Sequence, residues 1–238
     1  MLNHVNLAIE KGKSLVVIGA SGSGKSVMLK HIVGLLKPDE GEVWYNGKRT
    51  DTLSEREMVD VRLDFGFLFQ MGALFDSMTV EENIAFPLVE HTTKTAEEIN
   101  RVVEQKLAMV GLPETRRKMP GQLSGGQRKR IALARAIAMD PKVIMYDEPT
   151  TGLDPIRSDV INELILKLQR ELKVTSIVVT HDMHSAFKVA DRIIMLHEGN
   201  FIFDGTPQQI QASPDPIVQR FVKGEAGEEE LASLNHRG

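Results

Sequence analysis

The chain has 238 residues, of which 42% are hydrophobic and 26% are charged, and it contains no cysteine. This is the composition of an ordinary globular protein that can bury a sizeable core. The lack of cysteine excludes disulfides and thiolate metal sites and fits a reducing cytoplasm, and the formal net charge of −4 argues against a dedicated nucleic-acid binder.

Two negative observations bear on membranes. No apolar run approaches the roughly 18 residues needed to span a bilayer, and the start of the chain lacks the charged-then-apolar pattern of a signal peptide. We therefore expect any membrane contact to come through partners.

The first predicted unit is strand, loop and helix. Residues 14–19 are a continuous apolar run, typical of a strand buried in a parallel sheet, and a helix is expected over 26–36. Between them stands GASGSGKS, a complete phosphate-binding loop. Lys25 is expected to reach the β- and γ-phosphates of a nucleotide, and Ser26 to ligate Mg²⁺. The expected nucleotide-binding residues here are Gly19, Ala20, Ser21, Gly22, Ser23, Gly24, Lys25, Ser26 and Val27.

Two further strands are predicted next. Residues 41–50 indicate a strand closed by the turn dipeptide Asn46-Gly47. Residues 62–70 form another apolar strand that ends at Gln70.

The middle of the chain is predicted to be helical. Thr79 and Glu82 have the spacing of a capping box, and Thr95 and Glu98 repeat it. After the second box, one apolar stripe predicts a packed helix; its members are Ile99, Val102, Val103, Leu107 and Val110.

A further helix is expected to begin at Ser124, where LSGGQ places a hydroxyl and backbone amides at a helix N-terminus. Such an end is a second anion cradle, separate from the phosphate loop. A single nucleotide needs one cradle, so the second indicates another nucleotide or another subunit. The basic run 128–130 is interpreted as a solvated helix face, because no aromatic residues accompany it.

The strand 142–148 ends in two acids. Asp147 is suited to hold Mg²⁺, and Glu148 to orient or deprotonate an attacking water. Adjacent strand residues point in opposite directions, so a bend at Glu148-Pro149 is required if both acids serve one site.

The remaining chain continues to alternate strands and helices. Asp154-Pro155 begins a helix whose expected buried face comprises Val160, Ile161, Leu164, Ile165, Leu168 and Leu172. The later elements are strands at 174–181 and 192–197, a helix near 185–190, a hairpin strand at 200–205 and a helix starting at Thr206-Pro207. The predicted fold is α/β: a mainly parallel sheet flanked by helices, with a small antiparallel element and an inserted helical subdomain.

The ordered motifs resemble those of ABC-type ATPases over nearly the whole chain. They are the phosphate loop, Gln70, LSGGQ, VIMYDE, GLD at 152–154, and His181. The resemblance implies a P-loop, RecA-like fold that binds ATP and Mg²⁺ and works as a pair of identical subunits with composite sites. Its implied domain division is a single domain, 1–238, with a core of 1–71 and 139–205, a signature subdomain of 72–138, and a C-terminal helical extension and acidic tail of 206–238.

The resemblance also implies residue roles. The residues Ser124, Gly125, Gly126 and Gln127 grip the γ-phosphate on the opposite subunit, and Asp154 crosses between subunits. Gln70 touches Mg²⁺ or the water, with Ser26 and Asp147 as the other metal ligands, and reports nucleotide state to the helical insert. His181 contacts the γ-phosphate; catalysis is thereby assigned to Glu148, His181 and Gln70.

Residues 71–88 resemble the ATPases of Mla/Mce lipid-transport systems of the MlaF type. This implies a peripheral protein on the cytoplasmic face of a Gram-negative inner membrane, with an integral membrane permease as partner and an Mce-domain protein and a small regulatory subunit alongside. The apolar residues of this stretch fit membrane-subunit contact and core packing equally; they are Met71, Leu74, Phe75, Met78 and Phe86.

Two departures from the pattern are visible. Gln127 stands where many Mla-type relatives have methionine, so an ATPase for import of amino acids or other small solutes stays open as the alternative. Residues 1–18 contain no Phe, Tyr or Trp, whereas family members carry an upstream aromatic that stacks on adenine. We expect weaker adenine binding, or a missing upstream segment.

Overall fold

The computed structural model describes residues 2–226, and its centre is a six-stranded sheet in the order β4-β5-β6-β1-β7-β8. The first five strands in this order are parallel, and β8 runs antiparallel to β7. The predicted fold class is confirmed. The strands are β1 (Ser14–Ile18), β4 (Phe65–Leu68), β5 (Val143–Asp147), β6 (Thr175–Val179), β7 (Arg192–His197) and β8 (Asn200–Gly205).

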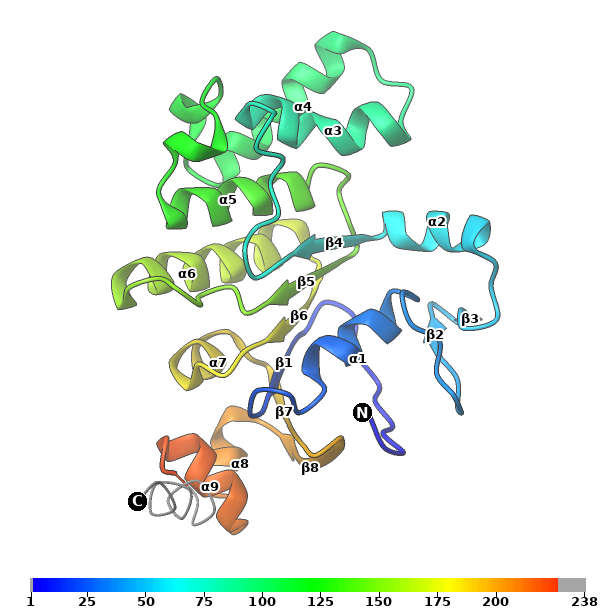
Figure 1. The fold of residues 1–238 in the computed structure, drawn as a ribbon, viewed down its shortest axis with the longest axis vertical. Coiled ribbons are helices and arrows are strands. Elements are labelled where there is room, and N and C mark those ends of the chain that lie inside the picture. The colour runs from blue at the N-terminus through cyan, green and yellow to red at the C-terminus, as the bar shows by residue number, and fades with distance from the viewer. Residues whose placement is uncertain (1, 227–238) are drawn as a thin grey trace, which may run out of the picture.

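Helices cover both faces of this sheet (Figure 1). Because side chains alternate along a strand, Val16 and Ile18 of β1 pack into one hydrophobic cluster, and Leu15 and Val17 pack into the other. The helices are α1 (Lys25–Ile32), α2 (Glu55–Leu63), α3 (Val80–His91), α4 (Ala96–Met109), α5 (Gly125–Ala136), α6 (Pro155–Leu172), α7 (Met183–Val189), α8 (Pro207–Gln211) and α9 (Pro216–Lys223).

The antiparallel element predicted over 41–50 is a hairpin of two short strands, β2 (Trp44–Tyr45) and β3 (Lys48–Arg49). Asn46 and Gly47 both have positive φ, at 48° and 78°, as a two-residue turn between right-twisted strands requires.

The strand predicted over 62–70 is wrong for its first three residues and its last two. Arg62 and Leu63 end helix α2, and β4 begins only at Phe65. Helix α2 starts at a capping box that the sequence already carries: Ser54 accepts a hydrogen bond from the Glu57 amide, and the Glu57 carboxylate accepts one from the Ser54 amide. The capping box at Ser54 therefore starts a helix that extends to Leu63, into the segment predicted as a strand.

Two other predictions need correction. Helix α1 ends at Ile32 instead of residue 36, because Gly34 at φ +67° stops it in a left-handed turn. In α6, Val160 is 46% exposed and does not belong to the buried face. That face begins at Ile161, because none of the first six residues of α6, 155–160, is buried.

The capping boxes at Thr79 and Thr95 and the helix start at Ser124 are confirmed. Helices α3, α4 and α5 pack together beyond the β4 edge, and α8 and α9 lie at the β8 end (Figure 1). The subdomain boundaries stay predictions, and residues 227–238 of the expected acidic tail lie outside the described part. None of the helices in residues 2–226 combines the length and the apolarity required of a membrane span.

Candidate functional site

The phosphate-binding loop joins β1 to α1 at the carboxyl end of the parallel strands. Gly19 has φ +153°, and a Cβ atom there would lie 2.2 Å from the backbone oxygen of Leu196. Only glycine fits where β1 passes β7 so closely. All nine residues expected to bind nucleotide, 19–27, lie in this loop and the first turn of α1.

The N-terminus of α1 differs from every other α-helix start in the described chain. Helices α2 to α9 each begin with a side-chain cap, whereas α1 begins at Gly24 with none. Its first backbone N–H groups are therefore left for a ligand. The Ser23 hydroxyl beside them is buried and has no hydrogen-bond partner. An anion such as a phosphate would satisfy both.

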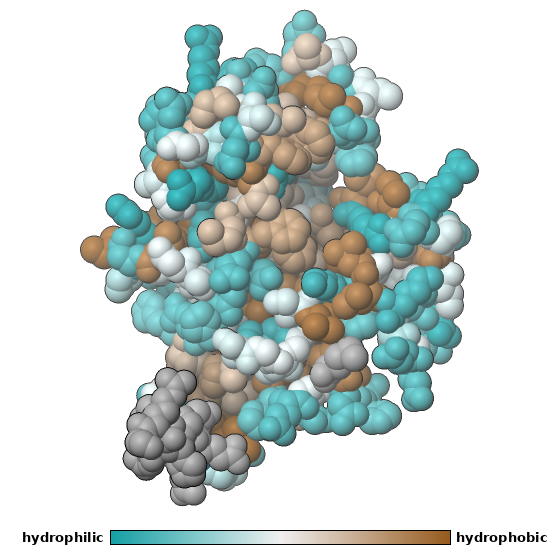
Figure 2. All heavy atoms as spheres, in the orientation of Figure 1, coloured by the Kyte–Doolittle hydropathy of each residue, from teal (hydrophilic) through white to brown (hydrophobic). Residues whose placement is uncertain are grey.

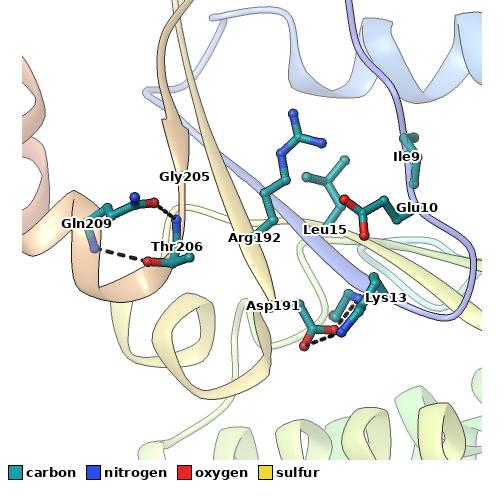
Figure 3. A pocket seen from close by; sticks show the side chains of 10 residues that line it. Ile9, Glu10, Lys13, Leu15, Asp191, Arg192, Gly205, Thr206 and Gln209 are labelled. Carbon is teal, nitrogen blue, oxygen red and sulfur yellow. Dashed lines mark hydrogen bonds and ion pairs between the residues drawn. The ribbon is translucent and has the colours of Figure 1, made fainter.

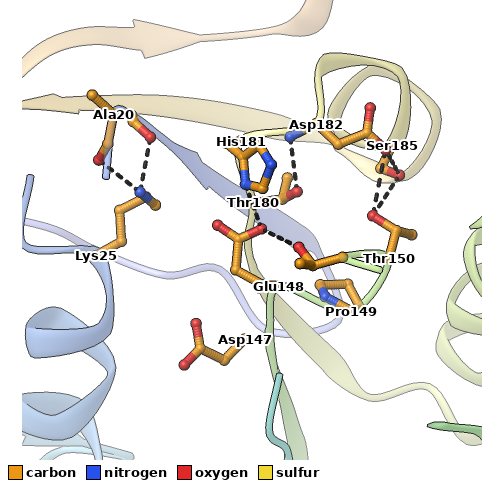
Figure 4. Close-up of polar contacts among 12 residues, drawn as sticks. Ala20, Lys25, Asp147, Glu148, Pro149, Thr150, Thr180, His181, Asp182 and Ser185 are labelled. Atoms are coloured by element: carbon orange, nitrogen blue, oxygen red, sulfur yellow. Dashed lines mark hydrogen bonds and ion pairs between the residues drawn. The ribbon is translucent and has the colours of Figure 1, made fainter. Parts of the chain in front are cut away.

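Lys25 places a buried ammonium group at this end. Its Nζ donates to the carbonyl oxygens of Gly19 at 2.8 Å and Ala20 at 2.9 Å (Figure 4). Burial lowers the pKa of Lys25, while the carboxylates of Glu148 and Asp147 act in the opposite direction. The cation and both acids thus belong to one electrostatic site.

Ser26 and Asp147 supply the oxygens of the expected metal position. The Ser26 hydroxyl lies 3.3 and 3.4 Å from the two carboxylate oxygens of Asp147. Burial raises the pKa of Asp147, and the Ser26 hydrogen bond opposes that rise. Within residues 2–226, no group of three or more His, Cys, Asp or Glu residues gathers as a metal cluster. A hydroxyl and one carboxylate fit Mg²⁺, which takes its other ligands from phosphates and water.

Glu148 supplies the bend that the acid pair requires. Its φ is +51°, a left-handed conformation that is unusual outside glycine and found at functional sites. The Glu148 amide donates to the carbonyl oxygen of Val179 at 2.9 Å. The carboxylate oxygen Oε2 accepts from the Thr151 hydroxyl at 3.1 Å, and His181 Nδ1 lies 2.8 Å from the same oxygen. Figure 4 shows both acids on the side of the chain that faces Lys25.

A buried polar network lies next to His181 in the loop after β6 and the start of α7. The hydroxyl of Ser185 donates to Asp182, the Asn162 amide donates to Ser185 at 2.9 Å, and Asp182 approaches the Thr150 hydroxyl at 3.4 Å. These contacts tie the loop after β6 to the loop after β5 (Figure 4).

The signature residues 124–127 stand apart from this site. Ser124 caps α5 by accepting from the Gln127 amide, and no hydrogen bond in the described chain joins these residues to the phosphate loop. Asp154 caps α6 and pairs with Arg157 at 3.2 Å. Gln70 is exposed beyond β4 and makes no hydrogen bond among the residues described. Figure 1 shows the N-termini of α1 and α5 on the same side of the molecule.

The interpretation of run 128–130 as a solvated helix face is wrong for Lys129, which is only 7% exposed. Its Nζ donates to backbone oxygens of the loop after β5. Helical periodicity is the missed signal, because Lys129 shares a face with the buried Gly126 and Leu133.

Two hollows lie away from this chemistry. One, of about 310 Å³, lies at the amino ends of β1 and β7, opposite the phosphate loop, where Asp191 accepts from the Ser14 amide (Figure 3). The other, of about 510 Å³, lies between α1, the hairpin and the N-terminal segment. Apolar side chains gather over this part of the viewed face (Figure 2).

The sequence and fold have close counterparts. A family model described as ABC transporter matches residues 2–151. A protein of Mycobacterium tuberculosis named as a probable ribonucleotide transport ATP-binding protein, mkl, is 42% identical over 220 residues, which are 92% of this chain and 61% of that protein. The chain thus spans less than two thirds of that relative's length.

A second relative is matched over more of its length. The intermembrane phospholipid transport system ATP-binding protein MlaF of Haemophilus influenzae is 44% identical over 94% of this chain and 85% of its own. A solved dimeric structure of the ATP-binding cassette MJ0796, bound to ADP and phosphate, superposes with a TM-score of 0.80 at 38% identity, covering 87% of this chain and 90% of that one.

Proposed function

The chain belongs to the ABC transporter family, and we propose that it is the ATP-hydrolysing subunit of a transporter that moves phospholipids or other lipids between the inner and outer membranes of a Gram-negative bacterium. The observation that carries the ATPase proposal is the separation of two anion cradles in one chain. The uncapped start of α1 is one. The start of α5 is the other, because its capping box uses the amides of Ser124 and Gln127 and does not use those of Gly125 and Gly126.

Two copies of the chain would complete each other's sites. The phosphate loop of one copy holds ATP, and residues 124–127 of the second copy close over its γ-phosphate, with Asp154 crossing between them. The solved MJ0796 cassette is a dimer, which supports this arrangement. Closing and reopening of the pair would then drive the membrane subunits.

The chain's own residues divide the chemistry of hydrolysis. The backbone amides of 19–27 and the Lys25 ammonium bind the phosphates, and Glu148 takes the proton of the attacking water. His181, held by Glu148, keeps its other ring nitrogen for the γ-phosphate. Ser26, Asp147 and Gln70 would hold Mg²⁺, which would neutralise negative charge on the bound phosphates.

The proposed contact with a membrane permease rests on apolar side chains that follow β4. Met71 is 86% exposed and Phe75 is 41% exposed, whereas Leu74, Met78 and Phe86 are half-buried. Phe75 packs against Phe86 with ring centroids 4.8 Å apart. The stretch therefore serves both interpretations: part of it packs into the helical subdomain, and Met71 and Phe75 remain for a partner at the cytoplasmic face.

The lipid cargo is supported by the 44% identity to MlaF. The alternative is an importer of amino acids or other small solutes; the name of mkl refers to ribonucleotide transport and to no direction of transport. We expect the full chain, purified from its own cells, to retain a permease, an Mce-domain protein and a small regulatory subunit; a periplasmic solute-binding protein in their place would support the alternative.

A transfer assay tests the cargo directly. The purified complex should move fluorescent phospholipid between two vesicle populations only with ATP, and the same complex carrying Glu148→Gln should not. ATP hydrolysis without any lipid transfer would contradict the lipid cargo and leave the ATPase assignment intact.

A further inference from the structure

Lys129 joins α5 to the loop that carries Glu148. Its ammonium group donates to the backbone oxygens of Pro149 at 2.7 Å, Thr151 at 2.7 Å and Glu148 at 3.3 Å. An ammonium has three donors, and all three go to this single loop. The side chain is 7% exposed, so water competes little for these bonds.

Burial of the Lys129 ammonium group costs free energy, which a neutral side chain in the same place would avoid. Burying an ammonium is unfavourable unless it is fully hydrogen-bonded, and burial lowers the pKa of Lys129 to about 8. The other buried lysine of the helical part, Lys106, pairs with the carboxylate of Asp140. Lys129 instead faces backbone oxygens, and Glu148 is the carboxylate that acts on it.

The loop held by Lys129 contains a residue in a left-handed conformation. It begins with Glu148 at φ +51°, and such a conformation persists only where the surroundings fix it. The loop leads on to Leu153, which lies 3.6 Å from the position of a Cβ on Gly125. Helix α5 begins with Ser124 and Gly125. One turn further along the same helix, Lys129 holds the backbone of the Glu148 loop.

We propose that Lys129 is a positioning residue that makes the start of α5 and the Glu148 loop move as one body. This inference rests on the proposed function. When residues 124–127 of one copy close on the partner's nucleotide, Lys129 carries that displacement to Glu148 beside the copy's own phosphate loop. Residues 124–127 act on the partner's ATP, and Glu148 acts on the ATP in the chain's own phosphate loop. Lys129 thereby couples the two within one chain.

The test compares Lys129→Met with Lys106→Met in the full chain. Both changes remove a buried ammonium from the helical part, but only the first removes donors to the Glu148 loop. We expect Lys129→Met to lower kcat for ATP by roughly tenfold to 10²-fold, since a misplacement of about 1 Å has effects of this size. The Kd for ATP should stay within about twofold, and Lys106→Met should keep kcat within about twofold.

A structural role alone would lower kcat equally in both variants, or lower ATP binding together with kcat, and either result would overturn the inference. Lys129→Gln keeps amide donors at a shorter reach and should lose less kcat; it carries the same test if Lys129→Met does not fold. A wild-type chain that neither binds nor hydrolyses ATP would refute the proposed function itself. A hydrolysing wild type whose Lys129 variants keep full kcat would refute only the coupling.

Discussion

The Nδ1 atom of His181 lies 2.8 Å from Oε2 of Glu148. The two residues follow neighbouring parallel strands, β6 and β5, whose register pairs Val179 with Asp147. Glu148 is 13% exposed in its side chain and His181 is 59% exposed. The carboxylate thus contacts one ring nitrogen, and we propose that the other nitrogen of the ring contacts a phosphate.

Replacement of Glu148 by Gln should stop the chemical step while sparing binding. The amide cannot accept a proton from water, so we expect kcat to fall by roughly 10²- to 10⁴-fold, with ATP-bound dimers accumulating. Steady-state hydrolysis and size-exclusion chromatography with ATP measure both effects. Full turnover in this variant would remove Glu148 from its role as base.

His181→Ala should slow hydrolysis by roughly 10²-fold, because it removes a group placed to contact the developing charge. His184 is the matched control, since it is exposed at the start of α7. We expect His184→Ala to change kcat by less than about twofold. Equal losses in the two variants would show that the effect of His181 comes from the fold of this loop.

Removal of divalent metal with a chelator should abolish hydrolysis, and added Mg²⁺ should restore it. Because the Ser26 hydroxyl lies beside the Asp147 carboxylate, Ser26→Ala should raise the Mg²⁺ concentration for half-maximal rate by roughly tenfold or more. Ser26→Thr keeps the hydroxyl and should stay close to wild type. A Ser26→Ala enzyme with unchanged Mg²⁺ dependence would contradict the assignment.

The stability of the protein should rise with pH through the titration of Lys129. Its pKa in the folded chain is about 8, against an ordinary value of 10.5, so the unfolded chain holds more protons between these pH values. The contribution of Lys129 is fully unfavourable below pH 8 and disappears as the pH approaches 10.5.

Urea unfolding at pH 7.5 and pH 10 checks this. Relative to Lys129→Met, the wild type should gain about 2–4 kcal/mol over the interval, at about 1.4 kcal/mol per pH unit of pKa difference. Because the other ionisable groups are common to both proteins, their effects cancel in the comparison. Parallel pH curves for the two proteins would contradict the lowered pKa.

Most elements could be predicted because their signals are local. The apolar runs of β1 and β5, the boxes at Thr79 and Thr95 and the Asp154-Pro155 start are all present as expected. The missed helix α2 has an equally local signal in Ser54 and Glu57, but the apolar residues after it favoured a strand.

The sequence predicted which residues form the site, but only part of how they are arranged in space. The phosphate-loop residues lie in one continuous segment, so their arrangement follows from the chain itself. Helical spacing could have indicated that Lys129 is buried. Its contact partner and the exposure of Val160 could not be predicted, because they depend on what packs against each helix. Lys129 contacts the loop after β5, whereas Val160 stays 46% exposed.

By itself, the sequence determined the α/β fold, the ABC family motifs and the need for a bend at the acid pair, since each depends on residues near one another along the chain. Only the tertiary structure decided that the bend is Glu148 itself, that His181 contacts its carboxylate, and that Lys129 holds its backbone. Those contacts join residues 19 to 33 positions apart, and they form because the parallel register of β5 and β6 and the packing of α5 bring the segments together.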